Sequence, residues 1–163
     1  MANIHILYGS STGATEAAAQ QLAALLGAEA KPIAAASPED FEADLLILGS
    51  STWGYGELQD DWAAGIALLD AADLSGRKVA VFGTGDSVGF ADTFANALGI
   101  LADKAVERGA TLVGQVPAVG YAAVESLAVR DGNFVGLALD DTNEAEQTPD
   151  RIAAWAKELQ AAI

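Results

Sequence analysis

Short apolar segments alternate along the chain with longer stretches in which apolar and polar residues are mixed. Near-continuous apolar segments of this length are typical of strands in a parallel sheet that is covered on both faces. The alternation predicts an α/β fold with a doubly wound parallel sheet. The five predicted strands are residues 3–8, the weaker 30–33, 44–49, 78–83 and 111–116.

Four of the intervening or following stretches have the pattern of helices that pack on a sheet. They are residues 13–26, 60–70, 90–108 and 149–163. Gly27 and Gly109 act as stop signals for the first and third, because glycine is common directly after a helix. Thr148 can cap the last helix, with Pro149 at its first position. The length and pattern predict one domain over residues 1–163.

The stretch after the fifth strand fits this alternation less neatly. We interpret residues 117–135 as an insertion that splits the fifth strand, with residues 133–140 completing it. Asp131-Gly132 within this stretch is a typical turn signal. The predicted sheet therefore has five strands, the last of which is interrupted.

The charge balance and the rare residue types exclude several function classes. With 8 Lys+Arg against 23 Asp+Glu, the formal net charge is −15, which repels nucleic acid and attracts basic protein surfaces. The chain has no cysteine and one histidine, His5, which we expect to pack within a strand, so we expect no metal site. No signal peptide or long apolar span is evident, so we expect a cytoplasmic protein that does not bind membranes.

Polar, glycine-rich segments follow the first, third and fourth predicted strands. In a doubly wound parallel sheet, ligands bind outside the carboxyl ends of the strands, so these segments are the candidate site. They are residues 10–15 (SSTGAT), 50–57 (SSTWGYGE) and 84–90 (TGDSVGF).

The first of these segments combines hydroxyl groups and a glycine where an apolar strand turns into a helix, without a Lys or Arg. Backbone N–H groups at a helix N-terminus, the helix dipole and hydroxyl donors can together hold a phosphate. The same residues also suit an ordinary helix start with a Ser or Thr cap. A Walker-type phosphate loop is excluded, because Ala14-Thr15 stands where Gly-Lys would be needed.

The other two segments carry aromatic residues beside glycines. Trp53 and Phe90 fall in loops, where large aromatic side chains often provide surfaces for stacking, although packing beneath the loop is an alternative. Neighbouring glycines allow the backbone to approach a ligand. Two aromatic planes beside a phosphate site suit a planar, nucleotide-like cofactor. Trp62 and Trp155 fall on predicted helices, and we expect them in the core, although an influence of Trp62 on the ligand is an alternative because it lies at the edge of an aromatic segment.

Taken in order, these motifs resemble those of the long-chain flavodoxins over essentially the whole chain. Residues 10–15 match the family's phosphate loop, and residues 52–62 (TWGYGELQDDW) and 83–98 (GTGDSVGFADTFANAL) match its two flavin loops. The insertion at residues 117–135 resembles the one that defines long-chain members. The resemblance implies a flavodoxin-like three-layer sandwich with strand order 2-1-3-4-5, for which flavodoxin is the standard example.

The resemblance also implies a non-covalently bound FMN that cycles by single electrons at low potential, mainly between semiquinone and hydroquinone. The chain would then be a monomeric electron carrier rather than an enzyme, and it would meet basic surfaces of reductases and electron acceptors transiently. A flavin-dependent reductase of the quinone or FMN type is the alternative, although residues 83–89 miss the GxGxxG spacing of a nicotinamide site. A receiver-type signalling domain is excluded, because Gly49-Ser50-Ser51 stands where its phospho-accepting Asp is required.

The family's cofactor contacts can be transferred to matching positions in this chain. Residues 10–15 would hold the 5′-phosphate, Trp53 and Phe90 would cover the two flavin faces, and backbone centred on Gly56 would flip to meet the proton at flavin N5. Phe90 replaces the usual Tyr and lacks its phenol oxygen. The implied contacts are Ser10, Ser11, Thr12, Gly13, Ala14, Thr15, Ser51, Thr52, Trp53, Gly54, Tyr55, Gly56, Thr84, Gly85, Asp86, Gly89 and Phe90.

Overall fold

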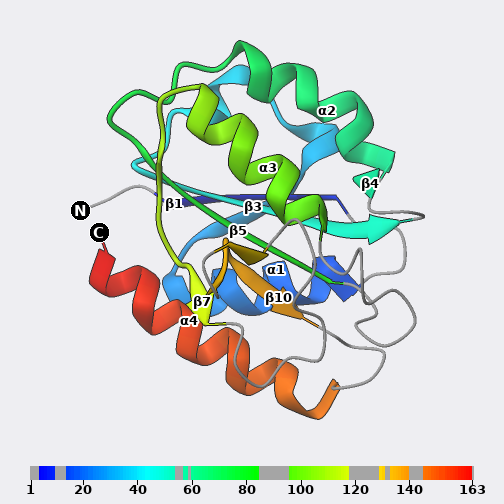
Figure 1. The fold of residues 1–163 in the computed structure, drawn as a ribbon, viewed down its shortest axis with the longest axis vertical. Coiled ribbons are helices and arrows are strands. Elements are labelled where there is room, and N and C mark those ends of the chain that lie inside the picture. Colours follow the sequence, from blue (N-terminus) through cyan, green and yellow to red (C-terminus); the bar gives the residue numbers. More distant parts are fainter. Residues whose placement is uncertain are drawn as a thin grey trace.

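The structure, a computed structural model, describes residues 4–9, 14–53, 57–58, 60–84, 96–117, 129–130, 133–139 and 145–162. Its middle layer is a sheet in the order β10-β5-β3-β1-β2, and all the pairings along this path are parallel (Figure 1). The strands of this path are β1 (Ile4–Gly9), β2 (Glu29–Pro32), β3 (Leu45–Trp53), β5 (Lys78–Thr84) and β10 (Leu137–Leu139).

The fifth position of the sheet is filled by two short strands. β6 (Thr111–Leu112) pairs with the start of β5, whereas β10 pairs with its end. Because both lie beside β5, they occupy one strand position in two pieces. The predicted order 2-1-3-4-5 with an interrupted fifth strand is therefore confirmed.

Two helices cover each face of the sheet (Figure 1). α1 (Ala14–Leu26) and α4 (Thr148–Ala162) cover one face, while α2 (Asp60–Ala71) and α3 (Asn96–Glu107) cover the other. These bounds agree closely with the predicted helices, except that residues 90–95 lie outside the described residues. Gly27 and Gly109 end α1 and α3 with φ angles of 64° and 98°, which confirms them as stop signals. In the described part of the chain, no helix is long and apolar enough to cross a membrane.

Three short 3₁₀ helices complete the described helical structure. η1 (Ile33–Ala35) and η2 (Pro38–Phe41) lie between β2 and β3, and η3 (Ala145–Gln147) directly precedes α4. The predicted strand over residues 30–33 therefore ends one residue early, because Ile33 begins η1 and is buried there.

Two further predicted strand bounds are wrong. β3 continues past Gly49 to Trp53, because it also pairs with the end of β5 and, in antiparallel direction, with β4 (Glu57–Leu58). The strand predicted at residues 111–116 ends at Leu112. Gly114, with a φ angle of 79°, breaks it.

The residues after this break form a second, three-stranded antiparallel sheet. It contains β7 (Val116–Pro117), β8 (Val129–Arg130) and β9 (Asn133–Phe134) in the order β7-β9-β8. Arg130 pairs with Asn133, on either side of the predicted turn at Asp131-Gly132, which itself lies outside the described residues. Of the described residues 133–139, only β10 joins the main sheet. The predicted completion of the fifth strand by residues 133–140 is therefore confirmed only for Leu137–Leu139.

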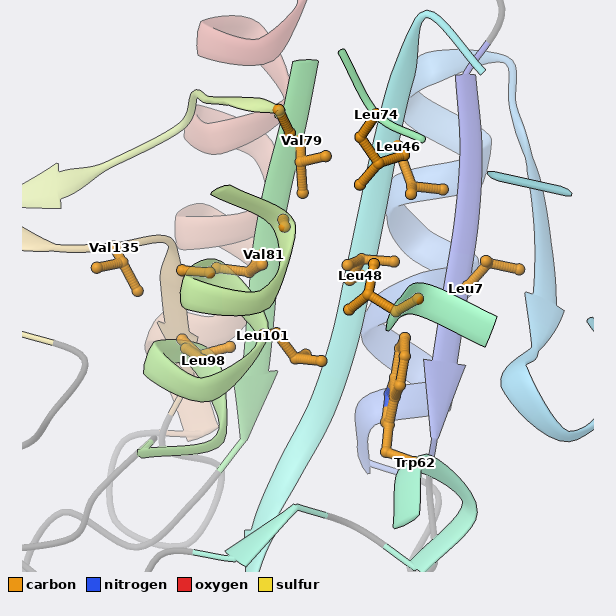
Figure 2. Packing of buried hydrophobic residues seen from close by; sticks show 14 of the residues in the cluster. Leu7, Leu46, Leu48, Trp62, Leu74, Val79, Val81, Leu98, Leu101 and Val135 are labelled. Carbon is orange, nitrogen blue, oxygen red and sulfur yellow. The ribbon is translucent and has the colours of Figure 1, made fainter. Parts of the chain in front are cut away.

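Side chains from the central strands alternate between two hydrophobic cores. Leu46, Leu48, Val79 and Val81 face α2 and α3 (Figure 2). Their neighbours in sequence face α1 and α4, where Phe82 packs against Trp155 with ring centroids 6.1 Å apart. Burial on both faces explains why these strands are apolar at almost every position. Trp62 and Trp155 are buried in opposite cores, as predicted.

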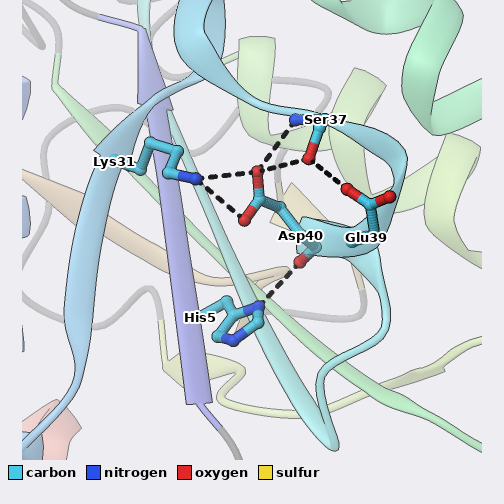
Figure 3. A network of polar contacts seen from close by, with 5 residues as sticks. All are labelled: His5, Lys31, Ser37, Glu39 and Asp40. Carbon is cyan, nitrogen blue, oxygen red and sulfur yellow. Dashed lines mark hydrogen bonds and ion pairs between the residues drawn. The ribbon is translucent and has the colours of Figure 1, made fainter.

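A polar network joins β1, β2 and η2 (Figure 3). The His5 Nδ1–H donates to the backbone carbonyl of Asp40 at 2.9 Å, and Lys31 Nζ lies 3.1 Å from each Asp40 carboxylate oxygen. The Ser37 N–H also donates to Asp40 at 2.8 Å, which completes a capping box at the start of η2. Burial opposes ionisation of Asp40, but the bonds from Ser37 and Lys31 to its carboxylate outweigh burial. They hold the pKa of this carboxyl below its ordinary value.

We expect Asp40→Ala to lower the free energy of unfolding at neutral pH by about 1–2 kcal/mol, because it removes a helix cap and a partly exposed ion pair. Since the pKa of Asp40 is lowered by folding, this contribution is full above the pKa of an unfolded Asp and fades as the pH falls through the lowered folded value. Urea unfolding of the two proteins between neutral and acid pH measures the difference.

Lys31→Met is the matched control, because it removes the ion pair and keeps the Ser37 cap. We expect it to lose less than half as much stability as Asp40→Ala. A deficit for Asp40→Ala that stays constant down to strongly acid pH would show that the ionised carboxylate is not its source.

Candidate cofactor site at the carboxyl ends of the strands

The three segments singled out in the sequence lie at strand ends that are side by side. Residues 50–53 of the second segment belong to β3, so the prediction that Trp53 falls in a loop is wrong. β1 ends at Gly9, which pairs with Ser50 in β3, and Ser51 of β3 pairs with Thr84 at the end of β5. α1 begins at Ala14, so its N-terminus points to the same edge of the sheet. The fold thus brings the described ends of the hydroxyl-rich segment and of both aromatic segments to one edge of the sheet.

The structure describes only part of the predicted contact set. It gives the backbone of Ala14, Ser51, Thr52, Trp53 and Thr84, and it gives Thr15 completely. The roles of all the predicted contacts stay predictions, and the remaining contact residues lie outside the described part of the chain. They are Ser10, Ser11, Thr12, Gly13, Gly54, Tyr55, Gly56, Gly85, Asp86, Gly89 and Phe90.

Two polar side chains are buried at this edge. Thr15, in the first turn of α1, is 0% exposed, and Ser50, beside the end of β1, is 1% exposed. Among the residues whose burial is described, Thr15 and Ser50 are the only buried residues of a polar or charged type. Burying a hydroxyl is unfavourable unless it is hydrogen-bonded. Buried hydroxyls therefore occur where the protein or a ligand provides a hydrogen-bond partner. A hydroxyl at a helix N-terminus suits a phosphate-bearing ligand.

Tyr8 adds a third polar group close to the end of β1. Its phenol donates to Glu16 Oε1 at 3.4 Å, across the segment that joins β1 to α1. Burial raises the pKa of Tyr8, and the negative charge of Glu16 raises it further. Tyr8 therefore stays protonated, and Glu16 contributes negative charge near the candidate phosphate site.

Glycines allow β3 and β5 to pack closely just beneath the site. A Cβ atom on Gly83 would overlap the carbonyl oxygen of Ser50, and one on Gly49 would overlap the ring of Phe82. The Trp62 Nε1–H donates to the carbonyl of Gly49 at 2.6 Å. Sequence reasoning missed these roles, although glycine inside an apolar strand is a known signal of close backbone approach.

Together, the aligned strand ends, the helix N-terminus and the buried Thr15 fit a ligand that carries a phosphate. The described residues include no group of three or more His, Cys, Asp or Glu side chains that could hold a metal ion.

Known proteins resemble this chain in both sequence and fold. The family model described as Flavodoxin matches residues 6–155. A flavodoxin of Picosynechococcus is 45% identical over 100% of this chain and 99% of that protein, and flavodoxin 1 of Azotobacter vinelandii is 45% identical over 98% and 97%.

Two solved structures show the similarity in three dimensions. The Fusobacterium nucleatum flavodoxin bound to flavin mononucleotide has a TM-score of 0.94 and 28% identity, covering 100% of this chain and 99% of that one. Oxidised flavodoxin 2 of Bacillus cereus has a TM-score of 0.80 and 29% identity, covering 99% and 100%.

Proposed function

Since the chain belongs to the flavodoxin family, we propose that it carries single electrons at low potential on a non-covalently bound FMN. One observation carries this proposal: the three segments with flavin-binding motifs begin at strand ends that lie side by side, next to the N-terminus of α1. The fold on which they lie matches that of a flavodoxin bound to flavin mononucleotide.

Each segment has its own part in holding the cofactor. Hydroxyls and backbone N–H groups of residues 10–15 bind the phosphate at the positive end of the α1 dipole, without a basic side chain in the segment. Trp53 and Phe90 cover the two faces of the ring system, and residues 84–86 line its pyrimidine edge. Residues 54–56 present their backbone to flavin N5, where two glycines give that backbone freedom to turn.

Bound FMN supplies reversible one-electron chemistry, and the protein sets the potential at which it occurs. Covering the ring excludes water, and acidic residues make additional negative charge at the site unfavourable. A unit charge about 10 Å away contributes roughly 1–2 kcal/mol at an effective dielectric constant of about 20. With a net charge of −15, several carboxylates can together lower the potential, although salt screens the distant ones.

The same acidity favours transient encounters with redox proteins that present basic surfaces, and we propose that the chain meets them as a cytoplasmic monomer. Electrostatic steering accelerates such encounters and is screened by salt. We expect the rate of electron transfer to a basic acceptor protein to fall by about tenfold or more between low and moderate ionic strength. Stopped-flow kinetics measures this, and a rate that does not change with salt would contradict steering by the acidic surface.

Reconstitution tests the proposed function. Apoprotein titrated with FMN should form a stoichiometric yellow complex whose flavin stays oxidised when NAD(P)H alone is added. A chain that takes up no FMN would contradict the proposal. Rapid bleaching of the bound flavin by NAD(P)H alone would instead indicate a reductase.

A further inference from the structure

Trp62 connects the start of α2 to the central strand of the sheet. Its side chain is 0% exposed, and its indole N–H donates to the Gly49 carbonyl at 2.6 Å. Trp62 is the third residue of α2, and Gly49 lies four residues before the end of β3. Figure 2 shows the indole beside Leu48, within the core between the sheet and the helices. This hydrogen bond thus joins two elements that are separated in sequence by the first aromatic segment.

Residues 54–56 lie between these two elements. On one side they follow β3, and on the other they lead into β4, whose Glu57 pairs with Trp53 and whose Leu58 pairs with Thr52. α2 begins at Asp60, directly after this short ladder. The bond from Trp62 to Gly49 therefore adds to this ladder a second attachment, through α2, to the strand from which the segment departs.

We propose that Trp62 is a positioning residue for residues 54–56, which acts through Gly49 without touching the cofactor. This inference rests on the proposed function, in which the backbone of these residues responds to the electron and proton taken up by the flavin. A segment whose two ends are fixed loses less conformational entropy when it adopts one arrangement against a ligand. Without the Trp62 bond only the β3–β4 ladder holds this end. The arrangement then becomes less favourable, most of all in the redox state that uses it.

Trp155 provides a matched control within the same chain. It is 1% exposed, and its indole N–H donates to the carbonyl of Gly114 at 2.7 Å. It lies in α4, in the core on the opposite face of the sheet, and Gly114 follows β6 rather than a predicted flavin segment. Replacing either tryptophan by phenylalanine removes one indole hydrogen bond and similar buried volume, so the loss of core packing is comparable.

The test compares Trp62→Phe with Trp155→Phe by FMN titration, urea unfolding of the apoproteins and potentiometric titration of both one-electron steps. We expect Trp62→Phe to raise the Kd of FMN roughly fivefold to tenfold and to reduce the formation constant of the half-reduced protein by a similar factor, which brings the two midpoint potentials closer. Trp155→Phe should lower the stability of the apoprotein and leave both redox quantities within about twofold of wild type.

The results distinguish a failure of the proposed role of Trp62 from a failure of the proposed function. Equal changes in the two variants, or wild-type potentials in Trp62→Phe, would overturn the role of Trp62 while FMN binding by the wild type stands. A wild type that binds no FMN would overturn the proposed function itself. If Trp62→Phe does not fold, hydrogen exchange of the two indole N–H groups in the wild type replaces it: FMN should slow exchange at Trp62 more than at Trp155, and equal slowing would overturn the proposal.

Discussion

Replacing Thr12 by Ala and Thr15 by Val together should weaken FMN binding by about a hundredfold or more, because two hydrogen bonds to a charged phosphate are each worth about 1.5–3 kcal/mol. Thr15 is fully buried in the first turn of α1, and valine keeps its volume and its branched shape there. Titration of the apoprotein with FMN, followed by flavin fluorescence, measures the change.

Riboflavin is the control ligand for this variant, because it differs from FMN only by the phosphate. Its affinity should stay within a few-fold of the wild-type value, since the aromatic segments are untouched. If the double variant loses FMN and riboflavin equally, residues 10–15 are not the phosphate site. The two ligands would then be responding to a general disturbance of the fold at the start of α1.

Gly83→Ala should lower the free energy of unfolding by about 3 kcal/mol, because the added methyl group overpacks the sheet. Its Cβ would overlap the backbone oxygen of Ser50 in the neighbouring strand, which cannot move aside as a flexible side chain can. Because Ser50 also pairs with Gly9 at the end of β1, the same displacement reaches the cofactor site. We therefore expect weaker FMN binding together with the lower stability in urea unfolding.

Gly76→Ala separates this packing effect from the general cost of replacing a glycine. Gly76 has a φ angle of 78°, and a Cβ there would meet nothing within 4 Å. Its replacement should cost about 1 kcal/mol from backbone conformation alone and should leave FMN binding unchanged. A Gly83→Ala protein as stable as Gly76→Ala would show that β3 and β5 do not approach as closely as described.

The layered fold could be predicted because burial on both faces leaves a strong pattern. Leu45 to Leu48 are fully buried, with neighbouring side chains pointing into opposite cores, so the sequence of β3 is continuously apolar. The helix ends at Gly27 and Gly109 could also be predicted from the sequence, because positive φ angles favour glycine. These signals are local, and each can be read within a short window of sequence.

The bounds that could not be predicted depend on partners far away in the chain. β3 continues through the polar residues Ser50 to Thr52 as far as Trp53, because β4 and the end of β5 supply hydrogen bonds there. Gly114 breaks the strand with its positive φ angle, and its carbonyl accepts a hydrogen bond from Trp155, which lies 41 residues later. No pattern of apolar and polar positions records such pairings.

The candidate site, like the fold, could be predicted from the sequence only in part. Its three segments could be found because hydroxyls, glycines and aromatic residues after strands are chemically distinctive, and their motifs resemble those of one family. The supporting contacts could not be found: the donation from Trp62 to Gly49 and the close approach of Gly83 to Ser50 arise only when distant segments meet. The sequence places Trp62 at the end of a segment that resembles a flavin loop, but it does not show the bond to Gly49.

Stepwise reduction of the FMN-loaded protein under anaerobic conditions, followed by its absorption spectrum and potential, shows whether the protein carries single electrons. A one-electron carrier should be reduced in two separate steps, with a half-reduced form accumulating between them and the second step at the lower potential. Reduction in a single two-electron step, with no half-reduced form at any potential, would show that the protein is not a one-electron carrier.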